Sequence, residues 1–101
     1  MLFEFSIIPI GAGSSIGDQL AEVLAIVDRS GLPYKVNPMG TIVEGGWDDV
    51  MALIKTCHDT VMAKQERAFI RIEVDDRKDK PMRIEEKIRS VEKRLGRELK
   101  K

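Results

Sequence analysis

The groups best suited to chemistry gather in one short segment near the middle of the chain. Asn37 precedes a Pro-Met-Gly turn, and Thr41 and Glu44 follow it, so an amide, a hydroxyl and a carboxylate lie close together. Pro38 fixes its own φ and biases the preceding residue towards extended geometry. Gly40 permits a close approach that a side chain would obstruct. Polar groups on so rigid a frame can bind a small molecule with little loss of entropy, although a plain hairpin explains the same spacing.

The other reactive side chains form no recognisable catalytic set. His58 is the only histidine and its neighbour Cys57 the only cysteine. Adjacent helical residues point about 100° apart, so these two cannot easily share a metal. The carboxylates of Glu4, Glu44 and Glu73 can approach one another on a sheet, but a catalytic pair needs a defined separation that spacing does not reveal. We therefore expect neither an enzyme, a metal site nor a resident cofactor.

Length and charge narrow the classes of function. The 101 residues fit one domain, residues 1–101, and 17 basic side chains balance 17 acidic ones. Zero net charge argues against nucleic-acid binding, as does the single aromatic, Phe69, in the strand where an RNA-recognition domain carries several. No apolar run reaches membrane-spanning length, and the N-terminal residues lack the basic start of a secretory signal. A cytoplasmic protein without membrane or nucleic-acid partners is the expectation.

Hydrophobic periodicity predicts seven elements. Alternation predicts strands at residues 2–10, 34–37, 41–44 and 67–76. Helical spacing predicts one helix that begins near Ser15, with a capping-box-like Asp18, and stops at Gly31. A second helix opens at Gly45-Gly46. A third, narrowly amphipathic helix ends near Gly96, and we expect the Lys-rich tail beyond it to fray.

This order predicts an α+β fold, the ferredoxin-like βαββαβ sandwich, with a four-stranded antiparallel sheet and an extra C-terminal helix. Right-handed crossovers place the first two helices on one face. The other face then carries Glu4, Ser6 and Ile8 with one of the two alternating sets of residues 67–76. We expect the third helix to cover part of that face and a neighbouring subunit the rest, so an oligomer is predicted.

Several motifs suggest a family. They are Phe5-Ser6-Ile7-Ile8-Pro9-Ile10-Gly11, the Ser15-Ile16 helix start, the hairpin Asn37-Pro38-Met39-Gly40-Thr41-Ile42-Val43-Glu44-Gly45, and the helix that begins near Trp47. With them the chain resembles the thiamine-binding protein family, the small single-domain group related to the YkoF-type thiamine and hydroxymethylpyrimidine binders. The resemblance covers nearly the whole chain. It implies the ferredoxin-like fold, dimers joined through their sheets and often tetramers, and ligand binding without chemistry.

The resemblance also suggests roles for individual residues. Glu44 could accept a hydrogen bond from the ligand's amino group, and Asn37, Thr41 and Ser6 can donate or accept. Met39, Ile8 and Trp47 could provide apolar contact. Thr41 and Glu44 are three residues apart, however, so on a regular strand they face opposite sides. Two alternatives stay open, a regulatory module for another small metabolite and a structural protein whose sheet serves only assembly.

Overall fold

The computed structural model describes residues 1–11, 13 and 16–101. Seven elements follow one another: β1 (Leu2–Pro9), α1 (Gly17–Arg29), β2 (Tyr34–Asn37), β3 (Gly40–Glu44), α2 (Trp47–Met62), β4 (Ala68–Asp75) and α3 (Glu86–Leu95). The predicted elements are all present, with ends that differ by a few residues. The cap expected at Ser15 lies outside the described residues. None of the described helices is long and apolar enough to span a bilayer.

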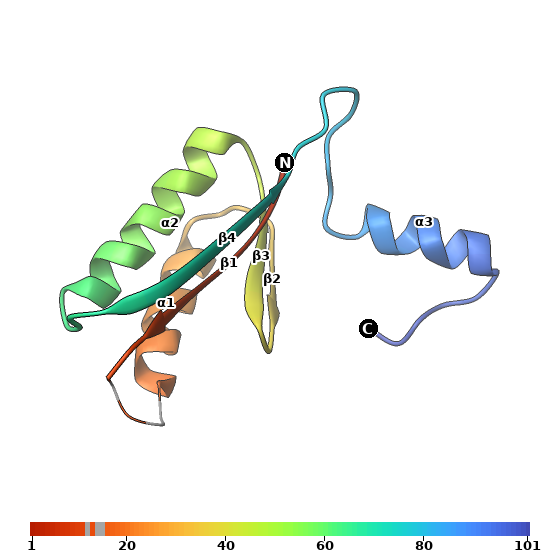
Figure 1. The fold of residues 1–101 in the computed structure, drawn as a ribbon. Helices are drawn as coiled ribbons and strands as arrows, with labels where there is room; N and C mark the ends of the chain where they lie inside the picture. Colours follow the sequence, from red (N-terminus) through yellow and green to blue (C-terminus); the bar gives the residue numbers. More distant parts are fainter. Residues whose placement is uncertain (12, 14–15) are drawn as a thin grey trace.

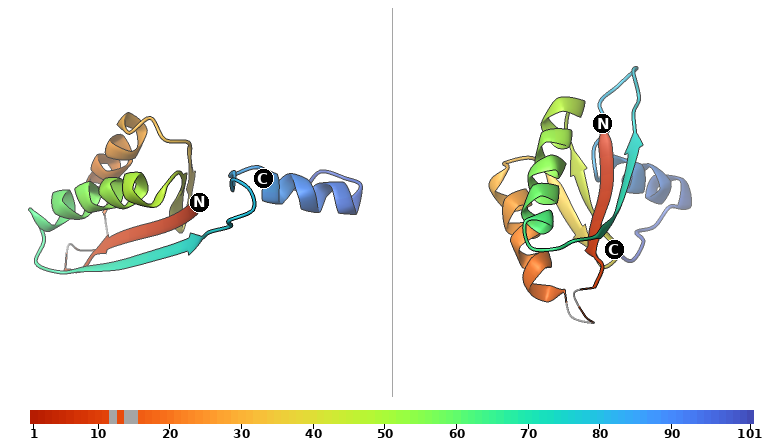
Figure 2. Two further views of the ribbon diagram at one scale, coloured as in Figure 1. Left: turned by 90° about the horizontal axis from the view of Figure 1, so that it is seen from above. Right: turned by 60° about the vertical axis from the view of Figure 1, so that its left-hand side comes forward.

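The four strands form one antiparallel sheet in the order β2-β3-β1-β4 (Figure 1). Both crossover helices, α1 and α2, lie on the same side of it (Figure 2, left). This is the ferredoxin-like α+β sandwich that the order of elements predicted. The opposite side of the sheet is called the open face below.

Strand register decides which side chains occupy each face. Phe3 pairs with Val74 and Phe5 with Ile72, so the set Ala68, Ile70, Ile72 and Val74 shares the helix side with the phenylalanines. Residues directly opposite in an antiparallel pair point to the same face. Phe69, Arg71 and Glu73 therefore join Ile8, Ser6 and Glu4 on the open face, which settles the choice that the sequence left between the two sets.

The core lies between the helices and the two central strands. Its fully buried side chains include Phe3 and Phe5 of β1, Val43 of β3, and residues of both helices: Val27, Val50 and Cys57. Burial raises the pKa of the Cys57 thiol to about 11, because the charged thiolate loses water there. Cys57 is thus the inert core residue that its place on the apolar stripe predicted.

Helix α3 extends away from the body of the protein, beyond the β2 edge of the sheet (Figures 1 and 2). Its stripe is largely exposed, with Val91 at 41% and Leu95 at 52%. Only its first turns and the segment just before it approach the open face, where Ile88 of the helix and Ile84 of that segment line a cavity with the strands. The third helix therefore covers much less of that face than the sequence suggested.

The tail beyond α3 folds back instead of fraying. Gly96 ends the helix with a left-handed φ of 72°, a conformation that favours glycine. The Glu92 carboxylate then accepts the Leu99 N–H at 2.6 Å and a bond from Lys101 Nζ at 3.0 Å. These bonds, first the backbone one and then the lysine, lower the pKa of Glu92. The expectation of a frayed tail was wrong, because the buried carboxylate of Glu92 accepts hydrogen bonds from the polar groups of the tail.

Candidate functional site

A cavity of about 480 Å³ lies between the open face and the start of α3. Small-molecule sites commonly have volumes of this order. Its apolar part comes from three strands, from α3 and from the segment just before that helix: Leu2, Phe3, Ile42, Val74, Ile84 and Ile88. Its polar part comes from every strand except β3, and from the helix: Glu4, Lys35, Asn37, Glu73, Asp75 and Lys87. An apolar lining with a few converging polar groups is the usual character of a ligand site.

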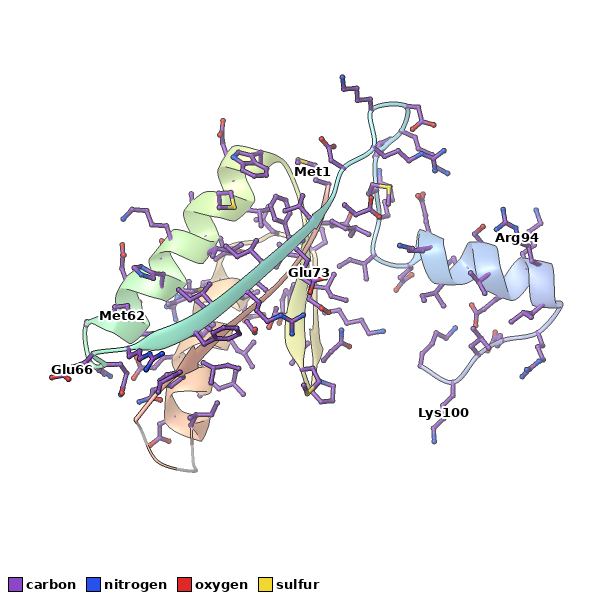
Figure 3. All side chains as sticks on the ribbon, viewed as in Figure 1. Met1, Met62, Glu66, Glu73, Arg94 and Lys100 are labelled. Carbon is purple, nitrogen blue, oxygen red and sulfur yellow. The ribbon has the colours of Figure 1, made fainter. Side chains whose placement is uncertain are left out.

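The cavity carries more negative than positive charge. Glu4 on β1 stands directly opposite Glu73 on β4, and Figure 3 marks Glu73 on the side of β4 turned away from α2. Asp75 adds a third carboxylate, held 3.6 Å from the Lys87 ammonium. Against three carboxylates stand the ammonium groups of Lys35 and Lys87. The cavity therefore favours a ligand that is cationic or rich in hydrogen-bond donors.

The hairpin contributes to this cavity through close packing. A Cβ added at Gly40 would stand 3.2 Å from Glu4 Cγ and 3.4 Å from the Phe5 carbonyl oxygen. The glycine therefore lets β3 lie close against the Glu4 side chain, which is the close approach that its place after Pro-Met predicted. Asn37, paired with Gly40 across the turn, places its amide in the lining of the cavity.

The structure separates the two hairpin groups that the sequence offered together. Thr41 pairs with Phe5 and is buried on the helix side. Glu44 pairs with Leu2 on the open face and lines a neighbouring groove beside Arg83 and the first turn of α3. The regular register of β3 thus keeps these side chains on opposite faces, as their spacing of three residues indicated.

The remaining predicted residues are spread over the molecule. Ser6 and Ile8 continue along the open face towards the far end of β1, and Ile8 is 44% exposed. Met39 is 82% exposed at the tip of the hairpin. Trp47 begins α2 and rests on Phe3, with ring centroids 6.0 Å apart. Of the predicted set, Asn37 alone lines the cavity described here.

Sequence reasoning missed most of the lining. Glu4 and Glu73 were recognisable as carboxylates that could meet on a sheet, but only their cross-strand pairing joins them to Asn37. Ile84 and Ile88 were recognised as one stripe of a helix. Nothing in their spacing indicated that the stripe begins at the open face. Asp75 and Lys87 gave no signal beyond their charge.

The described residues contain no group of three or more His, Cys, Asp or Glu side chains placed to hold a metal. His58 lies on α2 beside Asp59, with 3.0 Å between Nδ1 and Oδ1, outside the lining of the cavity. The lining of the cavity combines carboxylates and an amide, which can form hydrogen bonds, with apolar side chains, which can contact an apolar surface.

Comparison with known proteins places this chain among relatives of similar length. A family model described as "Thiamine-binding protein" matches residues 3–92. The UPF0045 protein MJ1052 of Methanocaldococcus jannaschii is 33% identical over 88 residues, which cover 87% of this chain and 88% of that protein. The UPF0045 protein YqgV of Bacillus subtilis is 35% identical over 98 residues, covering 91% and 94% of the two chains.

Solved structures agree with the fold. The crystal structure of MJ1052 superposes with a TM-score of 0.83 at 32% identity, covering 89% of this chain and 93% of that one. A Thermotoga maritima protein, whose name refers to thiamine biosynthesis and salvage, has a TM-score of 0.77 at 20% identity, covering 89% and 96%. The second likeness concerns the fold alone. The family match over most of the sequence, together with these relatives, shows that this chain belongs to the thiamine-binding protein family.

Proposed function

We propose that this protein binds thiamine or its hydroxymethylpyrimidine moiety, without chemistry on it, in the cavity between the open face and α3. The observation that carries the proposal is the combination of carboxylates and an amide over an apolar lining, in a member of the thiamine-binding protein family. No enzymatic step and no resident cofactor forms part of the proposal.

The chemistry of the ligand suits the cavity. An aminopyrimidine presents an amino donor and ring-nitrogen acceptors, which match a carboxylate such as Glu73 and the amide of Asn37. A thiazolium cation is favoured by the excess of carboxylates. Ile42 and Ile88 offer apolar contact from the two walls.

Calorimetric titration with thiamine and with hydroxymethylpyrimidine tests the proposal. A hydrogen bond to a charged group contributes about 1.5–3 kcal/mol, so we expect Glu4→Gln or Glu73→Gln to weaken binding by roughly tenfold or more. Glu66→Gln is the matched control, because this exposed carboxylate lies at the far end of the molecule (Figure 3). The absence of heat with either compound at millimolar concentration would refute the proposal.

Glu44→Gln tests the role that the sequence suggested for this residue. If the ligand extends from the cavity into the adjoining groove, this change also weakens binding, since Lys35 and Ile84 line both spaces. If it leaves binding unchanged while Glu73→Gln does not, the ligand is confined to the cavity. A thermal-shift screen across vitamins, amino acids and nucleotides separates thiamine binding from a regulatory role with another metabolite.

The proposal includes a homo-oligomer, either a dimer or a tetramer, that acts in the cytoplasm. Exposed apolar side chains on the open face, Ile8 at 44% and Phe69 at 55%, support association. Light scattering with and without thiamine measures the mass. A large assembly that binds no small molecule would favour a purely structural role.

A further inference from the structure

A second concave surface, the basic groove, lies between α3 and the segment that joins this helix to β4. That segment leaves β4, doubles back and enters α3 (Figure 1). The groove has a volume of about 390 Å³. Five cationic side chains line it: Arg77, Lys80, Arg83, Lys87 and Arg94. Only two carboxylates, those of Asp75 and Glu86, stand against them. A concave site with such an excess of cations concentrates anions.

The donors of the basic groove have the types that hold a phosphoryl group. Lys87, Ser90 and Arg94 are three, four and seven residues apart on α3, so they share one face of the helix. Lys80 comes from the connecting segment on the other side of the groove. A guanidinium can bind two phosphate oxygens at once, an ammonium acts as a point charge, and a hydroxyl can donate a hydrogen bond.

The internal ion pairs leave part of this charge uncompensated. Asp79 neutralises Arg77, with 2.6 Å between Nε and Oδ1. Lys80 and Arg94, by contrast, take part in none of the ion pairs that the described residues form. Both side chains are exposed. The groove therefore offers two cations to an anion without the loss of an existing pair.

The basic groove and the cavity on the open face adjoin each other and carry opposite charge. Asp75 and Lys87 line both spaces, with 3.6 Å between their charged groups. Apart from this shared pair, the cavity has the carboxylates of Glu4 and Glu73 against the ammonium of Lys35. The groove has four cations against one carboxylate. A ligand that spans both spaces fits best with a positive charge at one end and a negative charge at the other.

We propose that the basic groove binds the phosphoryl group of a phosphate monoester of thiamine, whose rings occupy the cavity. This inference rests on the function proposed above and extends it from the vitamin to its phosphorylated form. No bond of the ester is broken.

The shared ion pair suits such a ligand. The thiazolium cation can approach Asp75 while the phosphoryl group approaches Lys87, so each side chain exchanges one opposite charge for another. The side chains of Lys87 and Asp75 are 69% and 52% exposed, and an ion pair at such a surface contributes little to stability. The pair can therefore separate at little cost when the ligand binds.

Calorimetric titration with thiamine and with thiamine monophosphate at low ionic strength tests the proposal. We expect the ester to bind about tenfold more tightly, the effect of one hydrogen bond between charged groups. Lys80→Gln and Arg94→Gln should each reduce this preference at least about threefold and leave the affinity for thiamine unchanged, since neither residue lines the cavity. Glu73→Gln should weaken both compounds by the same factor and keep the preference.

Lys93→Gln is the matched control. It removes the same charge from the residue before Arg94, and Lys93 does not line the groove. We expect its preference for the ester to equal that of the wild type. An equal loss in Lys93→Gln and Arg94→Gln would attribute the effect to overall charge and overturn the proposal.

Salt provides a measurement on the unaltered protein. The cations of the groove are exposed, and salt screens exposed charges over about 10 Å at 0.1 M. The preference for the ester should therefore fall as sodium chloride is added. A preference that does not depend on salt would contradict a contact with these side chains.

Phosphorus NMR locates the phosphoryl group. Its second pKa is about 6 in a free monoester, and nearby cations favour the dianion. We expect a lower pKa for the bound ester than for the free one, and a smaller difference in Arg94→Gln. Equal pKa values for the bound and free ester would place the phosphoryl group in solvent and refute the proposal.

The titrations separate this inference from the proposed function. If thiamine binds and the ester binds no more tightly, the inference fails and the proposed function stands. If neither compound binds at millimolar concentration, the proposed function fails and the inference fails with it. If the ester alone binds, and Arg94→Gln abolishes that binding, the phosphoryl group is the main anchor and the inference is supported.

Discussion

Replacement of Gly45 by alanine should destabilise the protein through a contact with one buried side chain. A Cβ at this position would lie 3.0 Å from Val50 Cγ2 and 3.5 Å from Leu32 Cδ2. Val50 is fully buried, and a β-branched residue in a helix has one strongly preferred rotamer, so the methyl cannot turn away. The Gly45 N–H donates to the Met1 carbonyl at 3.0 Å, which holds the backbone in place.

The size of the effect follows from this confinement. Forcing an extra methyl into a well-packed site costs about 1–3 kcal/mol. For a domain of this length, that corresponds to a melting temperature lower by roughly 5–20 °C. The backbone of Gly45 is not left-handed, so alanine brings steric overlap without conformational strain.

Urea denaturation followed by circular dichroism measures the change. Gly46→Ser is the matched control, because a Cβ at Gly46 meets nothing within 4 Å and serine is a good N-cap for α2. We expect this control to be neutral or to stabilise by a few tenths of a kcal/mol. In a Val50→Ala background, which removes the opposing methyl, Gly45→Ala should cost at least about 0.5 kcal/mol less. An equal cost in both backgrounds would refute the steric explanation.

Three further outcomes are expected. The pKa of Glu92 is lowered in the folded state. The stabilisation that its carboxylate gives the tail is therefore complete above the ordinary glutamate pKa of about 4.3. This stabilisation is lost as the pH falls through the lower pKa of the folded state. Amide exchange at Leu99 reports this loss, and Glu92→Gln should remove the pH dependence. Burial raises the pKa of Cys57 to about 11, so iodoacetamide at pH 8 should label it only after unfolding; rapid labelling of the native protein would contradict its burial. Gly96→Ala forces a side chain into a left-handed φ of 72° at a cost of about 1–2 kcal/mol, so exchange within α3 should accelerate several-fold while the melting of the sheet is unchanged.

Local patterns predicted most of the fold because they depend on neighbours in the chain. Alternation at Phe3 and Phe5 predicted a half-buried strand, and both residues are buried against the helices. Helical spacing placed Cys57 on an apolar stripe, and it is fully buried. The turn chemistry of Pro38 and Gly40 predicted a tight hairpin, which the pairing of β2 with β3 confirms.

The site was less predictable because it depends on register and on the direction of α3. Whether the side chain of Glu73 or that of Val74 lies on the open face depends on a one-residue choice that alternation alone leaves open, and pairing with β1 decides it. The path of residues 76–85 sets where α3 begins, and no periodic signal encodes that path. Nothing in the spacing of Glu92 indicated that its carboxylate would accept a hydrogen bond from the tail.

The sequence by itself therefore determined the order of elements, the buried stripes and the family, since each is recorded in the spacing of residues along the chain. Tertiary structure alone decided that Glu4 and Glu73 meet beside Asn37, and that β4, with Arg71 and Glu73, is the last strand of the described sheet. Those arrangements arise from pairing between segments far apart in sequence. Pairing energy depends on which faces can be buried together, a property of the assembled sheet rather than of any one strand.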